Sequence, residues 1–229
     1  MSRNNPIIVA LDVPSAQEAL ELVECIGDGA GMYKVGMELY AAAGPDLVRE
    51  LRARRREVFL DMKFYDIPET VRRATAQVAR LDVQLLTVHG SRAVMRAAVE
   101  GKGGSALGLL AVTVLTSFDE DDLADLGYPC AAAELVKLRV RKAKEAGVDG
   151  VVCSPLEVAA VREAMGPHAV LVTPGVRSAG AGAGDQKRVA TPAEAMRGGA
   201  TFVVIGRQIT RAPDPAAEAR RVLAELKSG

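Results

Sequence analysis

The sequence predicts an α/β fold, specifically a (β/α)8 barrel of the TIM type, formed as one catalytic domain by residues 1–229. Two observations predict it. Short apolar runs rich in β-branched residues recur eight times, and segments with helical periodicity separate most of them. Uninterrupted apolar runs are typical of parallel strands that are covered on both faces. The expected strands are residues 6–13, 32–38, 57–64, 85–90, 107–115, 150–154, 169–176 and 202–207.

Eight such repeats within 229 residues fit a compact closed barrel. A doubly wound open sheet is the alternative, because it is built from the same strand–helix repeats. The sequence shows no linker-like stretch between the repeats, and this favours one domain over two.

The helices between the strands have recognisable start signals. Residues 15–18, 154–157 and 191–194 each place Ser or Thr three residues before Glu, which is the pattern of a capping box. In the last two segments a proline also occupies the expected first helical position. The pair Asp214–Pro215 predicts the start of the final helix in a similar way.

The composition argues against several classes of function. Lysine and arginine total 29, as do aspartate and glutamate, so the chain lacks the basic excess of a nucleic-acid-binding protein. Aromatic residues make up 3% and tryptophan is missing, which disfavours a stacking surface for single strands. The first apolar stretch is too short for a signal peptide, and no run reaches the ~18 residues of a membrane span. We therefore expect a cytoplasmic protein without nucleic-acid or membrane partners.

Some chemically notable residues have ordinary explanations. Cys25, Cys130 and Cys153 show no CxxC spacing, so we expect reduced thiols that act as small apolar residues. His89 ends a core strand, where a structural role is favoured over a catalytic one. The acidic run at 119–122 follows a strand and predicts a helix start, with a magnesium site as the weaker alternative.

Polar residues cluster at the carboxyl ends of the expected strands, where (β/α)8 barrels hold their active sites. One charged strand end is ordinary, because strands must emerge into water. Polar residues of both signs at most of eight ends indicate a site instead. They are Asp12, Lys34, Asp61, Lys63, His89, Thr116, Ser117, Arg177 and Arg207.

The segment FLDMKFYDIPET, residues 59–70, places three charges at the end of an apolar strand. Asp61 and Lys63 are two apart, so they are expected to point to the same face of the strand, and Asp66 follows just beyond it. Two carboxylates ~4 Å apart repel by roughly 4 kcal/mol at an effective dielectric constant of about 20, and a lysine between them removes most of that repulsion. A pair of surface salt bridges in a loop is the alternative.

Acids on both sides favour the ammonium form of Lys63. A lysine that forms a Schiff base needs an apolar or cationic environment, so this pattern disfavours an imine-forming aldolase. It favours a reaction in which negative charge develops on the substrate, and an ammonium group stabilises and protonates that charge.

The end of the chain predicts a phosphate site. Gly206 would allow the backbone to approach a ligand closely, and Arg207 would supply a bidentate donor. Residues 176–188 are glycine-rich and are expected to form a lid, with Arg177 and Gln186 as its polar contacts. A glycine turn with a solvent-exposed arginine is the alternative for Gly206 and Arg207.

These motifs together resemble the orotidine 5'-monophosphate decarboxylase family. The matching blocks are ALDV, YKVGME, FLDMKFYDIPET, AVTVLTS, LVTPGVR followed by GDQKR, and VVIGR, and they extend from residue 7 to about residue 215. The pattern Asp-x-Lys-x-x-Asp alone is less specific. It is shared by a wider group that includes 3-keto-L-gulonate 6-phosphate decarboxylase and hexulose phosphate synthase.

The resemblance implies a (β/α)8 homodimer that converts orotidine monophosphate (OMP) to UMP and carbon dioxide in pyrimidine biosynthesis, without cofactor or metal. Lys63 would protonate the pyrimidine carbon, and Asp61 would lie beside the departing carboxylate. Asp66 and Thr70 would be contributed in trans by the partner subunit. The substrate-binding residues implied in the same way are Asp12, Lys34, Thr116, Arg177, Gln186, Gly206 and Arg207.

The sequence leaves two other functions open. One is a magnesium-dependent enzyme of the wider group acting on a sugar phosphate, although those relatives have an acidic residue near the position of Lys34. The other is a barrel that binds a phosphorylated ligand without catalysis.

Overall fold

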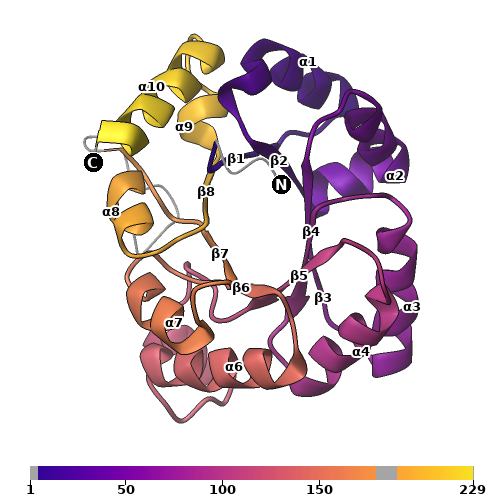
Figure 1. Cartoon of the computed structure of the whole chain (residues 1–229), viewed down its shortest axis with the longest axis vertical. Coiled ribbons are helices and arrows are strands. Elements are labelled where there is room, and N and C mark those ends of the chain that lie inside the picture. Colours follow the sequence, from indigo (N-terminus) through magenta and orange to yellow (C-terminus); the bar gives the residue numbers. More distant parts are fainter. Residues whose placement is uncertain (1–4, 179–189, 229) are drawn as a thin grey trace.

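The computed structural model describes residues 5–178 and 190–228, which form a closed parallel barrel surrounded by helices (Figure 1). The strands pair in chain order and β8 pairs with β1, so the barrel closes. The predicted (β/α)8 fold is therefore confirmed, and the open sheet is excluded. The strands are β1 (Ile7–Ala10), β2 (Met32–Gly36), β3 (Val58–Phe64), β4 (Leu85–His89), β5 (Gly108–Val112), β6 (Gly150–Val152), β7 (Val170–Thr173) and β8 (Phe202–Ile205).

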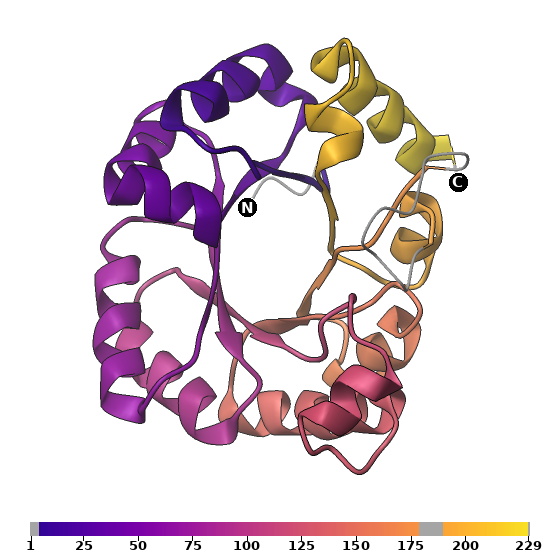
Figure 2. The same ribbon diagram turned by 180° about the vertical axis from the view of Figure 1, so that it is seen from behind.

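The helices form an outer layer around the barrel, as the two opposite views show (Figures 1 and 2). Two of them are additions to the simple repeat: α5 precedes α6 after β5, and α9 precedes α10 after β8. The described helices are α1 (Ala16–Ile26), a 3-10 turn η1 (Gly27–Gly29), α2 (Met37–Ala53), α3 (Pro68–Ala79), α4 (Arg92–Lys102), α5 (Glu120–Asp125), α6 (Ala132–Ala146), α7 (Val158–Met165), α8 (Pro192–Arg197), α9 (Arg207–Thr210) and α10 (Pro215–Ser228).

Strand alternation divides the apolar side chains between two cores. In β1, Ile8 and Ala10 point into the barrel, where they pack in a cluster that includes Phe59. Ile7 and Val9 of the same strand face the surrounding helices. The interior of the barrel is thus filled by side chains, and only its ends can hold polar groups.

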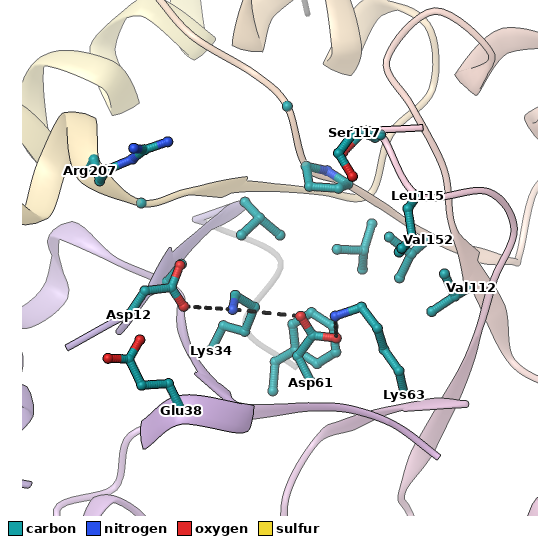
Figure 3. A pocket seen from close by; sticks show the side chains of 18 of the residues that line it. Asp12, Lys34, Glu38, Asp61, Lys63, Val112, Leu115, Ser117, Val152 and Arg207 are labelled. Carbon is teal, nitrogen blue, oxygen red and sulfur yellow. Dashed lines mark hydrogen bonds and ion pairs between the residues drawn. The ribbon is translucent and has the colours of Figure 1, made fainter. Parts of the chain in front are cut away.

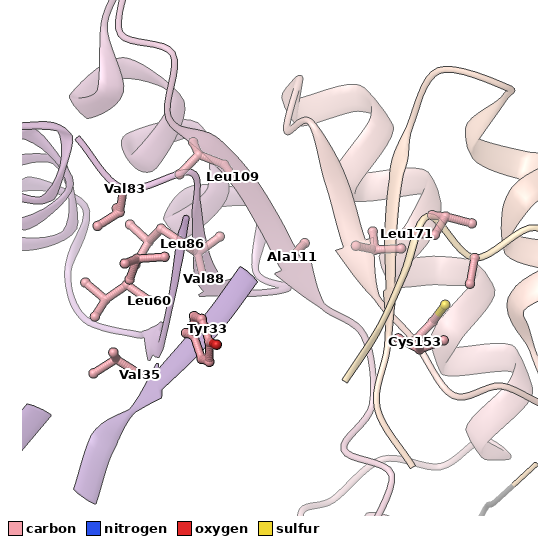
Figure 4. Close-up of a cluster of buried hydrophobic side chains, with 14 of the residues drawn as sticks. Tyr33, Val35, Leu60, Val83, Leu86, Val88, Leu109, Ala111, Cys153 and Leu171 are labelled. Atoms are coloured by element: carbon pink, nitrogen blue, oxygen red, sulfur yellow. The ribbon is translucent and has the colours of Figure 1, made fainter. Parts of the chain in front are cut away.

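The larger core lies between the strands and the helices, and Figure 4 shows part of it. Burying each large aliphatic side chain there contributes roughly 1.5–3 kcal/mol, and this layer holds many more buried apolar residues than the barrel interior does. The labelled members are Tyr33, Val35, Leu60, Val83, Leu86, Val88, Leu109, Ala111, Cys153 and Leu171.

Most predicted helix starts are confirmed. Ser15 accepts a hydrogen bond from the backbone N–H of Glu18 at 3.2 Å and begins α1. Thr191 and Glu194 form a complete capping box at the start of α8, with proline at its first position. The final helix begins at Pro215, as expected.

One predicted helix start is wrong. Ser154 does not cap a helix, because its Oγ accepts from the backbone N–H of Leu156 at 3.3 Å and closes a turn instead. The helix that follows, α7, begins only at Val158. Ser154 is fully buried at the end of β6, so its hydroxyl is used to satisfy the local turn.

The acidic run at 119–122 begins α5, as predicted. Asp119 accepts from the Asp122 N–H at 3.1 Å, and Asp122 accepts from the Asp119 N–H at 2.9 Å. Among the residues that the structure describes, no group of three or more His, Cys, Asp or Glu side chains is arranged to hold a metal ion.

No described helix is both long and apolar enough to span a membrane.

The three cysteines are free thiols in different environments. Cys153 is buried in the outer core, as expected of a small apolar residue, but Cys130 is half-buried and Cys25 is exposed. The prediction of an apolar role is therefore wrong for Cys25, which lies on the outer surface of α1.

Candidate active site

A cavity of about 480 Å³ opens at the carboxyl ends of the strands (Figure 3). This volume lies within the range of small-molecule sites. Its floor consists of apolar side chains from the barrel interior, including Phe59, Val112 and Val204. The polar residues that line it are Asp12, Lys34, Glu38, Asp61, Lys63, Thr116, Ser117, Arg177, Arg207 and Arg211.

Four of these residues form a row of alternating charge along one wall of the cavity (Figure 3). The Nζ atom of Lys34 lies 3.0 Å from Asp12 Oδ1 and 3.6 Å from Asp61 Oδ2. Asp61 Oδ1 accepts a hydrogen bond from Lys63 Nζ at 2.9 Å. We call Asp12, Lys34, Asp61 and Lys63 the charged row.

Strand geometry explains how the row is assembled. Asp12 and Asp61 each follow an interior residue by two positions, Ala10 on β1 and Phe59 on β3. Lys34 pairs in register with Ala10 on one side and with Phe59 on the other. Its amine therefore rises between two carboxylates contributed by the neighbouring strands.

Lys63 lines the cavity together with Asp61, as their spacing of two residues predicts, but it lies in an irregular part of β3. The pairing of β3 with β4 shifts register between Leu60 and Phe64, and Lys63 has a positive φ of 48°. This conformation costs an L-residue roughly 1–2 kcal/mol, so the surrounding structure must hold it in place. Strain of this kind is concentrated at functional sites.

Thr87 of β4 holds the irregular segment. Its Oγ1 accepts from the backbone N–H of Lys63 at 2.9 Å and donates to Asp61 Oδ1 at 2.9 Å. Thr87 is completely buried, so both bonds are shielded from water. One side chain therefore fixes both the backbone of Lys63 and the carboxylate of Asp61.

The carboxylate of Asp61 is the most electrostatically constrained group of the row. Burial alone would raise the pKa of Asp61, but the nearby Lys34 and Lys63 amines and the hydrogen bonds from Lys63 and Thr87 together lower it below the usual value. The side chain is 14% exposed, against 33% for Lys63 and 11% for Lys34. Asp61 is therefore ionised between two cations.

Within one chain, Lys63 does not lie between Asp61 and Asp66, so this prediction is wrong for the single subunit. Asp66 is exposed and its Oδ1 accepts from the N–H of Ile67 at 2.6 Å. Neither Asp66 nor Thr70 lines the cavity. The arrangement is the reverse of the expected one, since an acid lies between two lysines.

The arginine side of the cavity carries Arg177, Gly206 and Arg207 together, as predicted. The backbone N–H of Arg177 donates to Ala190 O at 3.0 Å, and its Nη1 donates to Val176 O at 2.8 Å. A Cβ atom added at Gly206 would be in ordinary van der Waals contact with Ala10 Cβ at 3.5 Å, so the neighbouring protein atoms alone do not require glycine here. Gln186 lies outside the described residues, as does most of the predicted lid.

Sequence reasoning missed three residues at the site. Glu38 and Arg211 line the cavity from the first turn of α2 and the end of α9. Thr87 could have been found, because it is a hydroxyl at an inward position between apolar residues of its strand. Arg211 follows Arg207 by four positions, the spacing that brings two side chains to one helix face.

His89 was expected to have a structural role, but its hydrogen bonding is only partly satisfied. Its buried Nδ1 has no hydrogen-bond partner among the described residues, and its ring lies 4.2 Å from the ring of Tyr65. Burial and the positive charge of Arg139 lower the pKa of His89. His89 does not line the cavity.

A closed (β/α)8 barrel whose carboxyl-terminal mouth holds ion-paired lysines and carboxylates defines a barrel enzyme. Residues 5–222 match the family described as Orotidine 5'-phosphate decarboxylase / HUMPS family. The chain belongs to this family and is a carboxy-lyase.

Individual relatives agree with the assignment. The chain is 50% identical over 220 residues to the orotidine 5'-phosphate decarboxylase of Bradyrhizobium sp. (strain ORS 278), covering 96% of this chain and 90% of that protein. It is 50% identical over 223 residues to the same enzyme of Methylobacterium sp. (strain 4-46), covering 96% and 94%. The crystal structure of the enzyme from Lactobacillus acidophilus superimposes with a TM-score of 0.84 at 36% identity, covering 97% of this chain and 99% of the other.

Proposed function

We propose that this protein decarboxylates orotidine 5'-monophosphate to UMP in pyrimidine biosynthesis, with residues 1–229 acting as one catalytic domain. The observation that carries the proposal is the charged row at one wall of a cavity that also holds Arg177 and Arg207. The row suits a reaction that develops negative charge, and the arginines suit the phosphate of a nucleotide.

In the proposed mechanism Lys63 is the proton donor. The bond from ring carbon C6 to the carboxylate breaks, carbon dioxide departs, and the electron pair remains on C6 in the plane of the ring. The ammonium of Lys63 stabilises this pair and transfers a proton to it, and the amine then regains a proton from water. The hydrogen bond from Lys63 to Asp61 supports this role, because it holds the Lys63 amine at the wall of the cavity.

The roles proposed for the remaining residues are those that the family resemblance implies. Asp61 would lie beside the departing carboxylate, and Asp12 and Lys34 would hold the ribose hydroxyls and the charge network. Thr116 would contact the base. The phosphate would lie among Arg177, Gly206, Arg207 and Gln186, the last of which lies outside the described residues.

We also propose that the active enzyme is a homodimer in which Asp66 and Thr70 complete the site of the partner subunit. Residues 65–70 are all exposed and lie next to the strand that carries Lys63. Tyr65 and Ile67 are 68% and 67% exposed, and two such large side chains exposed close together in one loop suggest a contact surface. Contact with a second copy would cover both residues and bring Asp66 to a neighbouring cavity.

Subunit mixing tests the contribution in trans. Lys63→Ala and Asp66→Ala proteins should each be nearly inactive, but dissociating and reassembling an equal mixture should restore roughly a quarter of wild-type activity. Half of the dimers would then be mixed, and each mixed dimer would have one intact site out of two.

The control for subunit mixing is a mixture of Lys63→Ala with Asp61→Ala. Lys63 and Asp61 of a given site come from the same chain, so each site of a mixed dimer lacks one of the two residues. No activity should therefore return. If both variants are inactive and their mixture does not recover although mixed dimers form, Asp66 acts in its own chain's site; an active Asp66→Ala protein would place Asp66 outside the mechanism.

The proposed reaction can be tested directly by ultraviolet absorbance. When orotidine monophosphate is mixed with the protein in excess EDTA, its ultraviolet absorbance should fall at a rate proportional to enzyme concentration. The sugar-phosphate alternative predicts no reaction in EDTA and turnover of a keto-sugar phosphate once magnesium is added. That second pattern would contradict the proposed function.

A further inference from the structure

Each arginine predicted to bind phosphate is followed by a polar residue, and these two polar residues are bonded to each other. Ser178 follows Arg177 after β7, and Gln208 follows Arg207 in α9. The backbone N–H of Ser178 donates to Gln208 Oε1 at 3.2 Å, and Gln208 Nε2 donates to Ser178 Oγ at 2.8 Å. The two segments that carry the arginines are therefore joined by a reciprocal pair of hydrogen bonds, which we call the bridge.

The bridge uses nearly all the hydrogen-bonding capacity of its members. Ser178 Oγ donates to Glu225 Oε2 at 2.7 Å and accepts from Gln208 and from Arg221 Nη2 at 3.0 Å. Gln208 Nε2 uses its second proton on Glu218 Oε1 at 2.9 Å. A hydroxyl has one donor and two acceptor positions, so the network fixes both side chains in one orientation.

The network rests on α10, which packs against α9 and the helices on either side (Figure 1). Glu218, Arg221 and Glu225 lie on one face of α10 at spacings of three and four residues. Arg221 Nη2 bonds both Glu218 Oε1 at 2.7 Å and Ser178 Oγ. Ser178 is only 5% exposed, so these bonds are largely protected from water.

We propose that Ser178 and Gln208 are positioning residues for the phosphate end of the site, an inference that rests on the proposed function. Neither lines the cavity, while the arginine beside each of them does. The bridge would fix the distance between the two backbone segments, and with it the separation of the guanidinium groups. Such preorganisation lowers the cost of ordering a binding site when the ligand arrives.

Steady-state kinetics with two substrates tests the bridge. Ser178→Ala and Gln208→Ala should each raise KM for orotidine monophosphate roughly fivefold, with kcat changed less than about twofold, as expected for loss of one or two shielded hydrogen bonds. The turnover of orotidine, which lacks the phosphate, should not change. The double variant should be no worse than either single variant, because both changes break the same bridge.

The Arg177→Ala/Arg207→Ala protein provides the decisive background. It should bind orotidine monophosphate weakly, and adding Gln208→Ala should have no further effect. Gln208→Glu keeps the shape of the side chain and places a carboxylate oxygen against Glu218, so it gives the same test if an alanine variant folds poorly. Gln17→Ala, at an exposed glutamine bonded to Glu21 within α1, is the matched control and should resemble the wild type.

Three results would contradict the positioning role of the bridge. They are an unchanged KM for orotidine monophosphate, equal losses for orotidine monophosphate and orotidine, and an effect of Gln208→Ala that is just as large in the Arg177→Ala/Arg207→Ala protein. The wild-type assay separates this inference from the proposed function. If the wild type does not decarboxylate orotidine monophosphate, both the proposed function and the positioning role are wrong. If the wild type is active and Gln208→Ala has the same KM as the wild type, only the positioning role is wrong.

Discussion

Replacing Lys63 with alanine is expected to lower kcat for orotidine monophosphate by about 10⁴-fold or more, because both the proton donor and the charge that faces the carbanion are lost. The fold should survive. Asp61 keeps Lys34 as a cationic neighbour at 3.6 Å and the hydrogen bond from Thr87, so removing Lys63 does not leave its carboxylate unpaired. Circular dichroism and single-turnover kinetics on the same preparation would check both statements.

The control for Lys63→Ala is Lys137→Ala, which removes an exposed lysine from α6 and should leave kcat unchanged. If the protein were a barrel that only binds a phosphorylated ligand, Lys63→Ala would keep the ligand affinity and the biological effect of the wild type. Residual turnover within tenfold of wild type would show that the proton comes from another group.

Replacing Asp61 with asparagine is expected to lower kcat by roughly 10²–10³-fold, a loss comparable to that of removing a group that orients charge in an active site. The isosteric amide can still accept the hydrogen bonds from Thr87 and Lys63, but it no longer neutralises the two amines. Lys63 would then face Lys34 without an anion between them, and its orientation toward the substrate would be lost.

The same substitution should lower the free energy of unfolding by about 2 kcal/mol at neutral pH, since it removes the charge that two partly buried cations share. The pH dependence has a definite sign. The lysines hold the pKa of Asp61 in the folded protein below its unfolded value, so its stabilising effect is complete above roughly pH 4 and is lost as the pH falls through the folded pKa. The difference between wild type and variant should therefore shrink in acid.

Denaturant unfolding from pH 7 to pH 3 would measure that difference. Asp28→Asn is the control, because the exposed Asp28 pairs with Arg56 at the surface and should contribute less than about 1 kcal/mol at any pH. A difference for Asp61→Asn that stays constant into acid would mean that its carboxylate is not stabilised in the folded state.

The elements of the fold were predictable because their signals are local. Apolar runs marked all eight strands, and capping residues such as Thr191 and Pro215 marked helix starts. The same local pattern failed at Ser154, where burial at the end of β6 directs the hydroxyl to a turn. The apolar run of the second strand also predicted a strand end at Glu38, although β2 ends at Gly36 and α2 begins at Met37.

The candidate site was predictable to the extent that it depends on strand ends. Asp12, Lys34, Asp61 and Lys63 were expected at the mouth of the barrel, and all of them line the cavity. Glu38 and Arg211 were missed because they reach the cavity from helices, whose rotation relative to the barrel depends on packing and not on a local motif.

The order of residues by itself determined which segments become strands and helices, and which charged groups emerge at the carboxyl end of the barrel, because both follow from patterns a few residues long. Only the tertiary structure decided which charges meet. Lys34 lies between Asp12 and Asp61 because β2 pairs with β1 and β3 in a particular register. Lys63 turns toward Asp61 because a register shift and Thr87 from β4 hold its backbone in a conformation that its own sequence disfavours.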